Sequence, residues 1–189
     1  AILARIQLMN LGYIAREVRD DLALIEKAAL DAAGVVRRLQ GFTRSQRQAA
    51  FQHVDMAEVC ADVVELLRPL WSSRRRGGKS PIAVRLRASG AAAVSGDPTE
   101  LREVLTNLLK NSLDAVDAGG TVVISVESRG ERVRVQVTDD GAGIPKELLA
   151  RVFTPFFTTK GEKGTGLGLC LAQQIVERHG GDLTLASEA

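Results

Sequence analysis

Two glycine-rich clusters within residues 137–171, VTDDGAGIPKELLARVFTPFFTTKGEKGTGLGLCL, constrain this chain more than any other feature. The first follows a strand-like run and places Asp139 on a tight turn with few side chains nearby, which suits a flat ring whose exocyclic amine needs an acceptor. The second cluster precedes an apolar helical pattern, and bare N–H groups at a helix start attract phosphate. It consists of four glycines, Gly161, Gly164, Gly166 and Gly168. With Lys160 between them, the two clusters predict the two ends of one nucleotide site.

The composition excludes several classes of protein. The 189 residues are enough for one domain plus an extension, and 45% hydrophobic with 25% charged residues indicates a globular chain. A net charge of +2 is too balanced to predict binding to nucleic acid or to a membrane surface. The sequence has no membrane-spanning run and no signal-peptide pattern. Cys60 and Cys170 lie in apolar helical patterns, which predicts buried reduced thiols and a cytoplasmic chain, although a longer protein could still be membrane-attached.

The N-terminal part carries a heptad pattern from about residue 15 to about residue 47. Its apolar positions alternate steps of three and four: Leu22, Ile25, Ala29, Ala32, Val36 and Leu39. This pattern is typical of a coiled coil or a four-helix bundle, and such a helix would be roughly 50 Å long. Because residues 1–10 are too short to cover its seam, we expect a homodimer through the N-terminal helices. Packing of this helix on its own domain is the alternative.

The remaining elements predict a second domain. Gln48 to Asp55 reads as a polar linker, which divides the chain into a helical dimerisation part, residues 1–50, and a domain over residues 51–189. An amphipathic helix is expected over Met56–Leu70, followed by a basic, solvated loop over Ser72–Ser80. Three segments then alternate in the strand manner: Ile82, Val84 and Leu86; Val122, Ile124 and Val126; Val133, Val135 and Val137.

The strand pattern also indicates how the layers are arranged. The last two segments flank Gly130 and should form an antiparallel hairpin. Alternation means that one face of the sheet is buried and the other is solvated, so the helices must lie on one face. We therefore predict an α+β protein, a two-layer α/β sandwich, preceded by the remnant of a helical dimerisation hairpin.

The helix expected over Pro98–Val116, with Asp97 as its N-cap, carries polar residues on one face. Its expected packing stripe is Leu101, Val104, Leu105, Leu108 and Ala115. The polar residues follow at steps of four, four and three, with Lys110 beside them: Glu103, Asn107, Asn111 and Asp114. A neutral side-chain oxygen can bind Mg²⁺, which keeps several waters when it holds nucleotide phosphates. A solvated face is the alternative, but the glycine clusters downstream favour a ligand role.

Four ordered motifs, NLLKNSLDA, DDGAG, FTPFFTTK and GTGLGL, resemble the N, G1, F and G2 boxes of the sensor histidine kinases. These kinases belong to the GHKL ATPase superfamily, which also includes gyrase, the heat-shock chaperone and the MutL mismatch-repair proteins. The resemblance covers roughly residues 51–189 and implies the Bergerat ATP-binding fold. The helix ending in GFTR resembles the second helix of the kinases' dimerisation and phosphoacceptor hairpin.

The resemblance also implies roles for individual residues, with ATP and Mg²⁺ as the cofactors. Asn111 would coordinate Mg²⁺, Asn107 would contact the phosphates, and Asn107 and Lys110 would be the catalytic residues. Asp139 would accept a hydrogen bond from the adenine amine, and the loop 153–160 would act as a mobile lid. The implied nucleotide-binding set is Asn107, Asn111, Asp139, Gly141, Gly143, Ile144, Thr159, Lys160, Gly164, Thr165, Gly166, Leu167 and Gly168.

Asn107 indicates the branch of the superfamily. Hydrolases and serine kinases of this fold carry a Glu at this position, where it activates water or a hydroxyl. Asn107 cannot accept a proton, whereas an imidazole already has a free lone pair at neutral pH. The residue therefore favours a histidine kinase, and Glu103, one turn further away, is given little weight as a substitute base.

The acceptor histidine of the family has no counterpart in this chain. His53 is expected in the linker and His179 at a helix end before Gly180-Gly181, so both should be structural or incidental. The acceptor is expected upstream of residue 1, and the γ-phosphate would pass from it to an aspartate of a response-regulator receiver domain in a two-component phosphorelay. Asp182–Ser187 should be a strand, and the family's next strand is missing, as in a fragment. The alternatives are a regulatory or dimerisation module without kinase activity, or another GHKL ATPase or serine kinase.

Overall fold

The computed structural model describes residues 51–72, 81–161 and 164–188 of the chain. The predicted coiled-coil helix, the homodimer contact, the boundary at residue 50 and most of the basic loop 72–80 lie outside these residues and stay predictions. The described elements run in the order β1, α3, α4, β2, β3, α5, β4, β5, α6, α7. Helix α6 is the short segment Lys146–Leu149.

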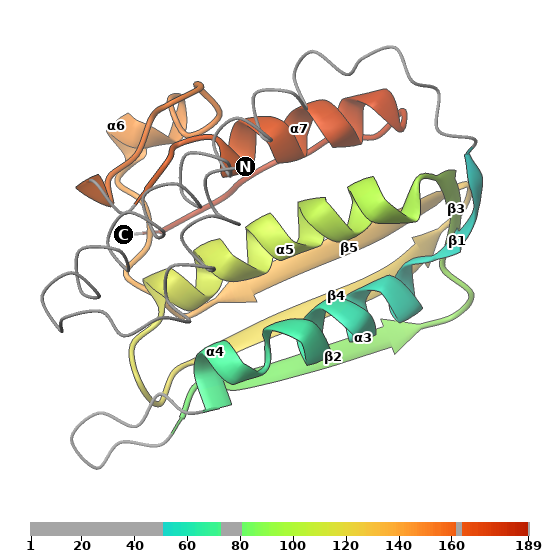
Figure 1. Cartoon of the computed structure of the whole chain (residues 1–189), viewed down its shortest axis with the longest axis horizontal. Coiled ribbons are helices and arrows are strands. Elements are labelled where there is room, and N and C mark those ends of the chain that lie inside the picture. The colour runs from blue at the N-terminus through green and yellow to red at the C-terminus, as the bar shows by residue number, and fades with distance from the viewer. Residues whose placement is uncertain (1–50, 73–80, 162–163, 189) are drawn as a thin grey trace, which may run out of the picture. The chain divides into compact units, whose positions relative to one another are not determined.

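The main sheet consists of three strands in the order β2-β4-β5 (Figure 1). They are β2 (Ala83–Ser89), β4 (Thr121–Arg129) and β5 (Arg132–Asp139). β2 is parallel to β4, and β4 is antiparallel to β5 with Val122 opposite Asp139. The predicted hairpin around Gly130 is confirmed. The glycine has φ +64°, which other residues rarely adopt.

The helices cover one face of this sheet, as the alternation predicted. In β4, Val122, Ile124 and Val126 are buried, and the residues between them are partly exposed. Helices α3 (Met56–Leu67), α5 (Pro98–Ala115) and α7 (Gly168–Arg178) lie on one side of the sheet (Figure 1). The α+β two-layer fold is therefore confirmed.

Helix α5 has two apolar faces rather than one stripe. Leu101, Leu105, Leu109 and Leu113 belong to the core cluster that contains the inward-facing residues of the sheet. Val104 instead packs with residues of α7, and Leu108 joins that second cluster. The prediction that Ala115 packs inward was wrong, because this residue is exposed at the end of the helix. Asp97 caps α5 as predicted, and its Oδ1 accepts the N–H of Thr99 at 2.7 Å.

The segment predicted as a polar linker contains a strand. β1 (Gln52–Asp55) pairs antiparallel with β3 (Ala93–Gly96), and His53 therefore lies in a strand. Only Val54 of this strand is buried, so the sequence shows no alternation there. Its partner lies about forty residues away along the chain, and pairing over such a distance leaves no local signal.

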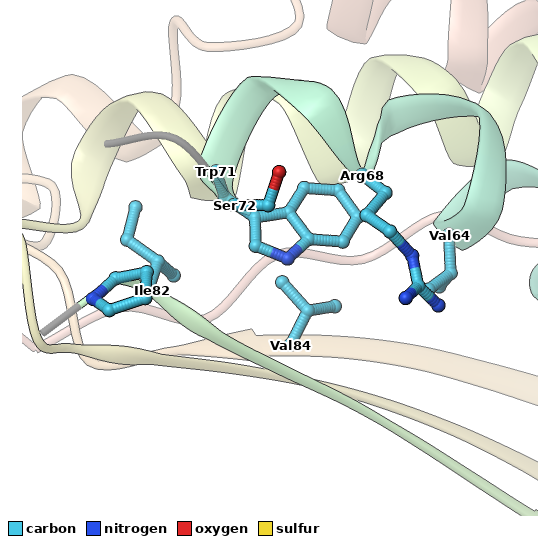
Figure 2. Close-up of a pocket in the computed structure, with 7 residues that line it drawn as sticks. Val64, Arg68, Trp71, Ser72, Ile82 and Val84 are labelled. Carbon is cyan, nitrogen blue, oxygen red and sulfur yellow. The ribbon is translucent and has the colours of Figure 1, made fainter. Parts of the chain in front are cut away.

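The helix predicted over Met56–Leu70 is divided in two. α3 ends at Leu67, and a short helix α4 (Pro69–Ser72) follows. Pro69 has no N–H to continue the ladder, which explains the break. Leu66, an apolar residue of the amphipathic helix predicted over Met56–Leu70, is exposed rather than packed in the core. Trp71 of α4 is buried and covers the end of the core next to this helix. Its indole lies over Val84 of β2 (Figure 2).

The predicted strand Asp182–Ser187 does not form in the structure. The segment nevertheless runs alongside β5, because Arg132 at the start of this strand pairs with Asp182 at 2.9 Å and the N–H of Ile144, beyond its other end, donates to Ser187 Oγ at 2.8 Å. Leu183 and Leu185 are half-buried, whereas their neighbours are exposed. The alternating sequence therefore reflects one-sided burial without a hydrogen-bonded ladder.

Candidate functional site

The first glycine cluster forms a turn against the C-terminal end of α5. Asp139 ends β5, and its Oδ1 accepts the N–H of Gly141 at 3.1 Å, which fixes the exposed carboxylate at the mouth of the turn. A Cβ on Gly141 would stand 2.6 Å from the carbonyl oxygen of Ala115. The N–H of Ala142 donates to that oxygen at 3.2 Å. The turn therefore needs glycine at position 141 to approach the helix backbone.

The two consecutive aspartates at this turn have different tasks. Asp140 Oδ1 accepts the N–H of Thr121 at 2.8 Å, so this side chain ties the turn to the start of β4. Asp139 is exposed and bonds within the turn itself. Both carboxylates are exposed, and the adenine-binding role predicted for Asp139 remains a prediction. Gly143, with φ +70°, completes the turn.

The second glycine cluster packs against the loop 153–160. The N–H of Phe156 donates to the carbonyl oxygen of Gly166 at 3.0 Å, and both residues have positive φ, 66° and 63°. A Cβ at Gly166 would collide with the backbone of Phe156, and one at Gly164 would collide with Thr158. The glycines therefore allow two stretches of backbone to touch. Phe156 has an unusual backbone conformation that the sequence did not predict.

Helix α7 begins beside the polar face of α5. A Cβ on Gly168, the first residue of α7, would lie 3.5 Å from Asn107 Oδ1, so the helix start and this half-buried side chain are neighbours. Leu167, the N-cap residue, makes no side-chain capping bond. The first amides of the helix are therefore not covered by a capping side chain, and such amides bind anions. Asn107 and Gly168, both in the predicted nucleotide-binding set, are thus neighbours, and their binding roles remain predictions.

Lys160 reaches from the loop to the same face of α5. Its Nζ donates to Asn111 Oδ1 at 3.2 Å and to Asp114 Oδ2 at 2.9 Å. The predicted metal ligand and the predicted phosphate-binding lysine thus contact each other. Asp114 appeared in the sequence as part of the polar stripe, but its pairing with Lys160 could not be read from the spacing.

Other residues of the predicted set lie around this core of the site without a described bond into it. Lys110, Thr159 and Thr165 are exposed. Ile144 is half-buried and its N–H is used by Ser187, whereas Leu167 is fully buried, so its side chain serves packing. The catalytic and binding roles predicted for these residues remain predictions.

The described side chains fit a magnesium-bound nucleotide. Asn111 and Asp114 already hold one cation, the ammonium of Lys160. The amide oxygen of Asn111 is a ligand that Mg²⁺ accepts. Within the described ranges, no group of three His, Cys, Asp or Glu side chains could hold a different metal ion.

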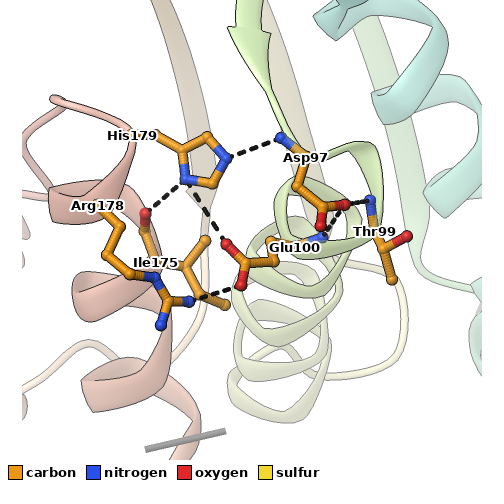
Figure 3. A network of polar contacts seen from close by, with 6 residues as sticks. All are labelled: Asp97, Thr99, Glu100, Ile175, Arg178 and His179. Carbon is orange, nitrogen blue, oxygen red and sulfur yellow. Dashed lines mark hydrogen bonds and ion pairs between the residues drawn. The ribbon is translucent and has the colours of Figure 1, made fainter. Parts of the chain in front are cut away.

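His179 lies at the N-terminal end of α5, away from Asn111 and Lys160, where it has a structural role (Figure 3). It caps α7 as predicted, and its Nε2 accepts the N–H of Asp97 at 3.0 Å while Nδ1 lies 2.8 Å from the carbonyl oxygen of Ile175. Arg178 pairs with Glu100 beside it at 2.8 Å. The side chain of His179 is only 7% exposed, so it is part of the framework and is not presented to a nucleotide.

Known proteins are similar to this chain in sequence and in fold. The family described as histidine kinase-, DNA gyrase B- and HSP90-like ATPase matches residues 96–189. The sensor histidine kinase ZraS of Escherichia coli (strain K12) is 43% identical over 95 residues, which are 50% of this chain and 20% of that protein. The catalytic domain of histidine kinase ThkA is 32% identical, with a TM-score of 0.60 over 68% of this chain and 81% of that domain. The chain belongs to the histidine kinase family.

Longer alignments extend this kinship along the chain. Sporulation kinase A of Bacillus subtilis (strain 168) is 31% identical over 182 residues, 96% of this chain and 28% of that kinase. The structure of ThkA in complex with response regulator protein TrrA shares the fold at 23% identity, with a TM-score of 0.66 over 95% of this chain and 51% of that one. This histidine kinase chain spans between 20% and 29% of the length of the ZraS proteins. No helix among its described residues is long and apolar enough to cross a membrane.

Proposed function

We propose that the chain binds Mg-ATP and transfers the γ-phosphate to a histidine on the dimerisation helix, upstream of residue 1, for relay to an aspartate of a response-regulator receiver domain. The observation that carries the proposal is the convergence on α5 of Asn107 with the start of α7 and of Asn111 with Lys160. Family membership supports ATP as the nucleotide.

Each binding residue has its own role in the proposed reaction. Asp139 accepts a hydrogen bond from the adenine amine, Asn107 and the amides at Gly168 hold the phosphates, and Asn111 holds Mg²⁺. Bound Mg²⁺ would neutralise phosphate charge. Lys160 donates to the phosphates from the loop 153–160. Most catalysis of phosphoryl transfer is positioning and electrostatics, which is what such a set provides.

The nucleophile is proposed to be an imidazole nitrogen. The bond between the γ-phosphorus and the bridging oxygen of ADP breaks as a bond from phosphorus to nitrogen forms, and the imidazole proton passes to solvent. Asn107 cannot act as a base, so a nucleophile that needs one, such as water, should react slowly. His53 lies in an exposed strand and His179 in the framework, so neither is proposed as the acceptor.

The test is labelling with γ-labelled ATP. The chain alone should bind Mg-ATP, hydrolyse it slowly and label itself very little. A longer fragment of the same kinase that supplies the acceptor helix should become labelled, with a product that is acid-labile and base-stable, as phosphohistidine is. Strong self-labelling that is lost in His53→Ala would show that the acceptor is misplaced. Binding without labelling of any supplied fragment would favour a regulatory module.

A further inference from the structure

Lys160 contacts α5 at Asn111, a residue with a different role in the proposed site. Lys160 is proposed to bind phosphate, and Asn111 is proposed to bind Mg²⁺. Asn111 and Asp114 lie three residues apart on one face of the helix, and Lys160 Nζ lies 3.2 Å and 2.9 Å from their oxygens. The backbone N–H of Lys160 donates to Thr158 Oγ1 at 3.1 Å, and this bond holds the backbone of Lys160 in place. The loop is thus joined to the helix by a charge pair.

The same atoms cannot serve both arrangements at once. In the proposed function Asn111 Oδ1 holds Mg²⁺ and the Lys160 ammonium donates to phosphate. In this structure that ammonium lies 3.2 Å from Oδ1, close to where a metal on this oxygen would have to be. Two cations so close repel each other, so Lys160 must leave before the metal can bind.

Asp114 is the residue that keeps Lys160 there. Of the two acceptors of Lys160 Nζ, Asp114 makes the shorter hydrogen bond. Asp114 also carries a negative charge, whereas Asn111 is neutral. The side chains of Lys160 and Asp114 are 39% and 47% exposed, and water and salt weaken a pair with such exposure. The contact can therefore be broken by a more highly charged ligand, such as a triphosphate.

We propose that Asp114 is a positioning residue that holds Lys160 over Asn111 in the nucleotide-free chain, so that Lys160 and Mg²⁺ compete for the same place. Nucleotide binding then transfers the ammonium from Asp114 to phosphate and frees Asn111 for the metal. The competition rests on the proposed function, whereas the contact itself can be tested without nucleotide.

The first arm measures amide hydrogen exchange of residues 153–161 in the nucleotide-free chain. Asp114→Asn keeps the shape of the side chain and removes its charge. It should speed exchange in this segment by about two- to fivefold, as loss of an exposed ion pair allows. Glu127→Gln is the matched control, because Glu127 pairs with Arg129 at 2.9 Å on the main sheet at similar exposure. The control should leave exchange of residues 153–161 unchanged.

The second arm measures ADP affinity by calorimetry, with Mg²⁺ and with chelator. Asp114→Asn should bind ADP about two- to fivefold more tightly in both conditions, because Lys160 is free to meet the phosphates. Lys160→Met should bind more weakly, since it loses the phosphate partner itself.

The outcomes separate the proposal from the proposed function. Unchanged exchange in Asp114→Asn would overturn the contact in solution. Faster exchange with weaker ADP binding only in Mg²⁺ would make Asp114 a metal ligand and overturn the competition. If the unsubstituted chain binds no nucleotide although Asp114→Asn exchanges faster, the proposed function fails and the competition with it, while the contact stands.

Discussion

Gly141 and Gly130 illustrate, at the scale of single residues, two different reasons for glycine. At Gly141 the limit is space, because a Cβ would lie 2.6 Å from the Ala115 carbonyl oxygen. At Gly130 the limit is the backbone, because φ is +64° and nothing lies within 4 Å of a Cβ. Only the first glycine adjoins the proposed nucleotide site.

These reasons predict different effects of alanine. Gly141→Ala should destabilise the fold by about 1–3 kcal/mol through overpacking and should also weaken ATP binding. Gly130→Ala should destabilise by about 1–2 kcal/mol through its left-handed backbone and should leave ATP affinity unchanged. Denaturant unfolding and calorimetry on both variants test this pair. If the two variants bound ATP with equal affinity, the turn at Gly141 would not be part of the nucleotide site.

Asn111 can be tested through its dependence on magnesium. Asn111→Ala should weaken ATP binding in the presence of Mg²⁺ and change it little in chelator, because the amide oxygen is proposed to act through the metal. Titrations of ATP in the two buffers measure the difference. If the dependence of binding on Mg²⁺ is unchanged, the ligand lies elsewhere, with Asp114 or Glu103 as the next candidates.

At the scale of elements, the paired helices α5 and α7 carry both halves of the site, and His179 joins them at the far end. Its Nε2 accepts the N–H of Asp97 at the start of α5, and its ring stacks on Phe51 with centroids 4.6 Å apart. A Cβ at Gly96 would stand 2.6 Å from the ring, so the neighbouring strand leaves room for it.

His179→Ala should therefore lower the free energy of unfolding by about 1–3 kcal/mol, because a part-buried N–H loses its acceptor and a cavity forms. His53→Ala is the control and should change stability by less than about 0.5 kcal/mol, since His53 is exposed. Urea denaturation of the two variants compares them. A stability equal to that of the unsubstituted chain in His179→Ala would contradict the structural role.

The elements also show where sequence reasoning succeeds. Regular alternation identified β4 and β5, and Asp97 before Pro98 marked the start of α5 as a capping side chain should. β1 was missed because its pairing with β3 is distant and only one of its side chains is buried. Candidate site residues could be named from the motifs and their resemblance to the histidine kinases, but the contact of Lys160 with Asp114 spans 46 positions and depends on the fold.

At the scale of the whole molecule, the core can be probed through its thiols. Both cysteines are free and buried, as predicted. Burial, with a smaller effect of Asp55, raises the pKa of the Cys60 thiol from 9.0 to about 12, and burial also raises the pKa of Cys170. Neither thiol should react with a disulfide reagent in the native chain, and both should react in denaturant.

The shifted pKa of Cys60 also predicts how stability depends on pH. Below pH 9 the thiol is protonated in both states, and its contribution is fully present. Between pH 9 and about 12 the unfolded chain loses this proton while the folded chain keeps it, so stability falls by up to about 1.4 kcal/mol per pH unit. Cys60→Ala should show a shallower fall in urea denaturation above pH 9. Parallel curves would contradict the buried, protonated thiol.

The central claim is that Asp139 and the surfaces on α5 form one adenine-nucleotide site. Calorimetric titration of ATP, ADP and GTP into the unsubstituted chain and into Asp139→Asn tests it directly. Because Oδ1 accepts the N–H of Gly141, the asparagine would turn its NH₂ group toward the adenine amine. The binding free energies of ATP and ADP should both become less favourable by about 1.5–3 kcal/mol. That of GTP, which presents a carbonyl there, should change less. Equal losses for ATP and GTP, or no ATP binding by the unsubstituted chain, would contradict the account.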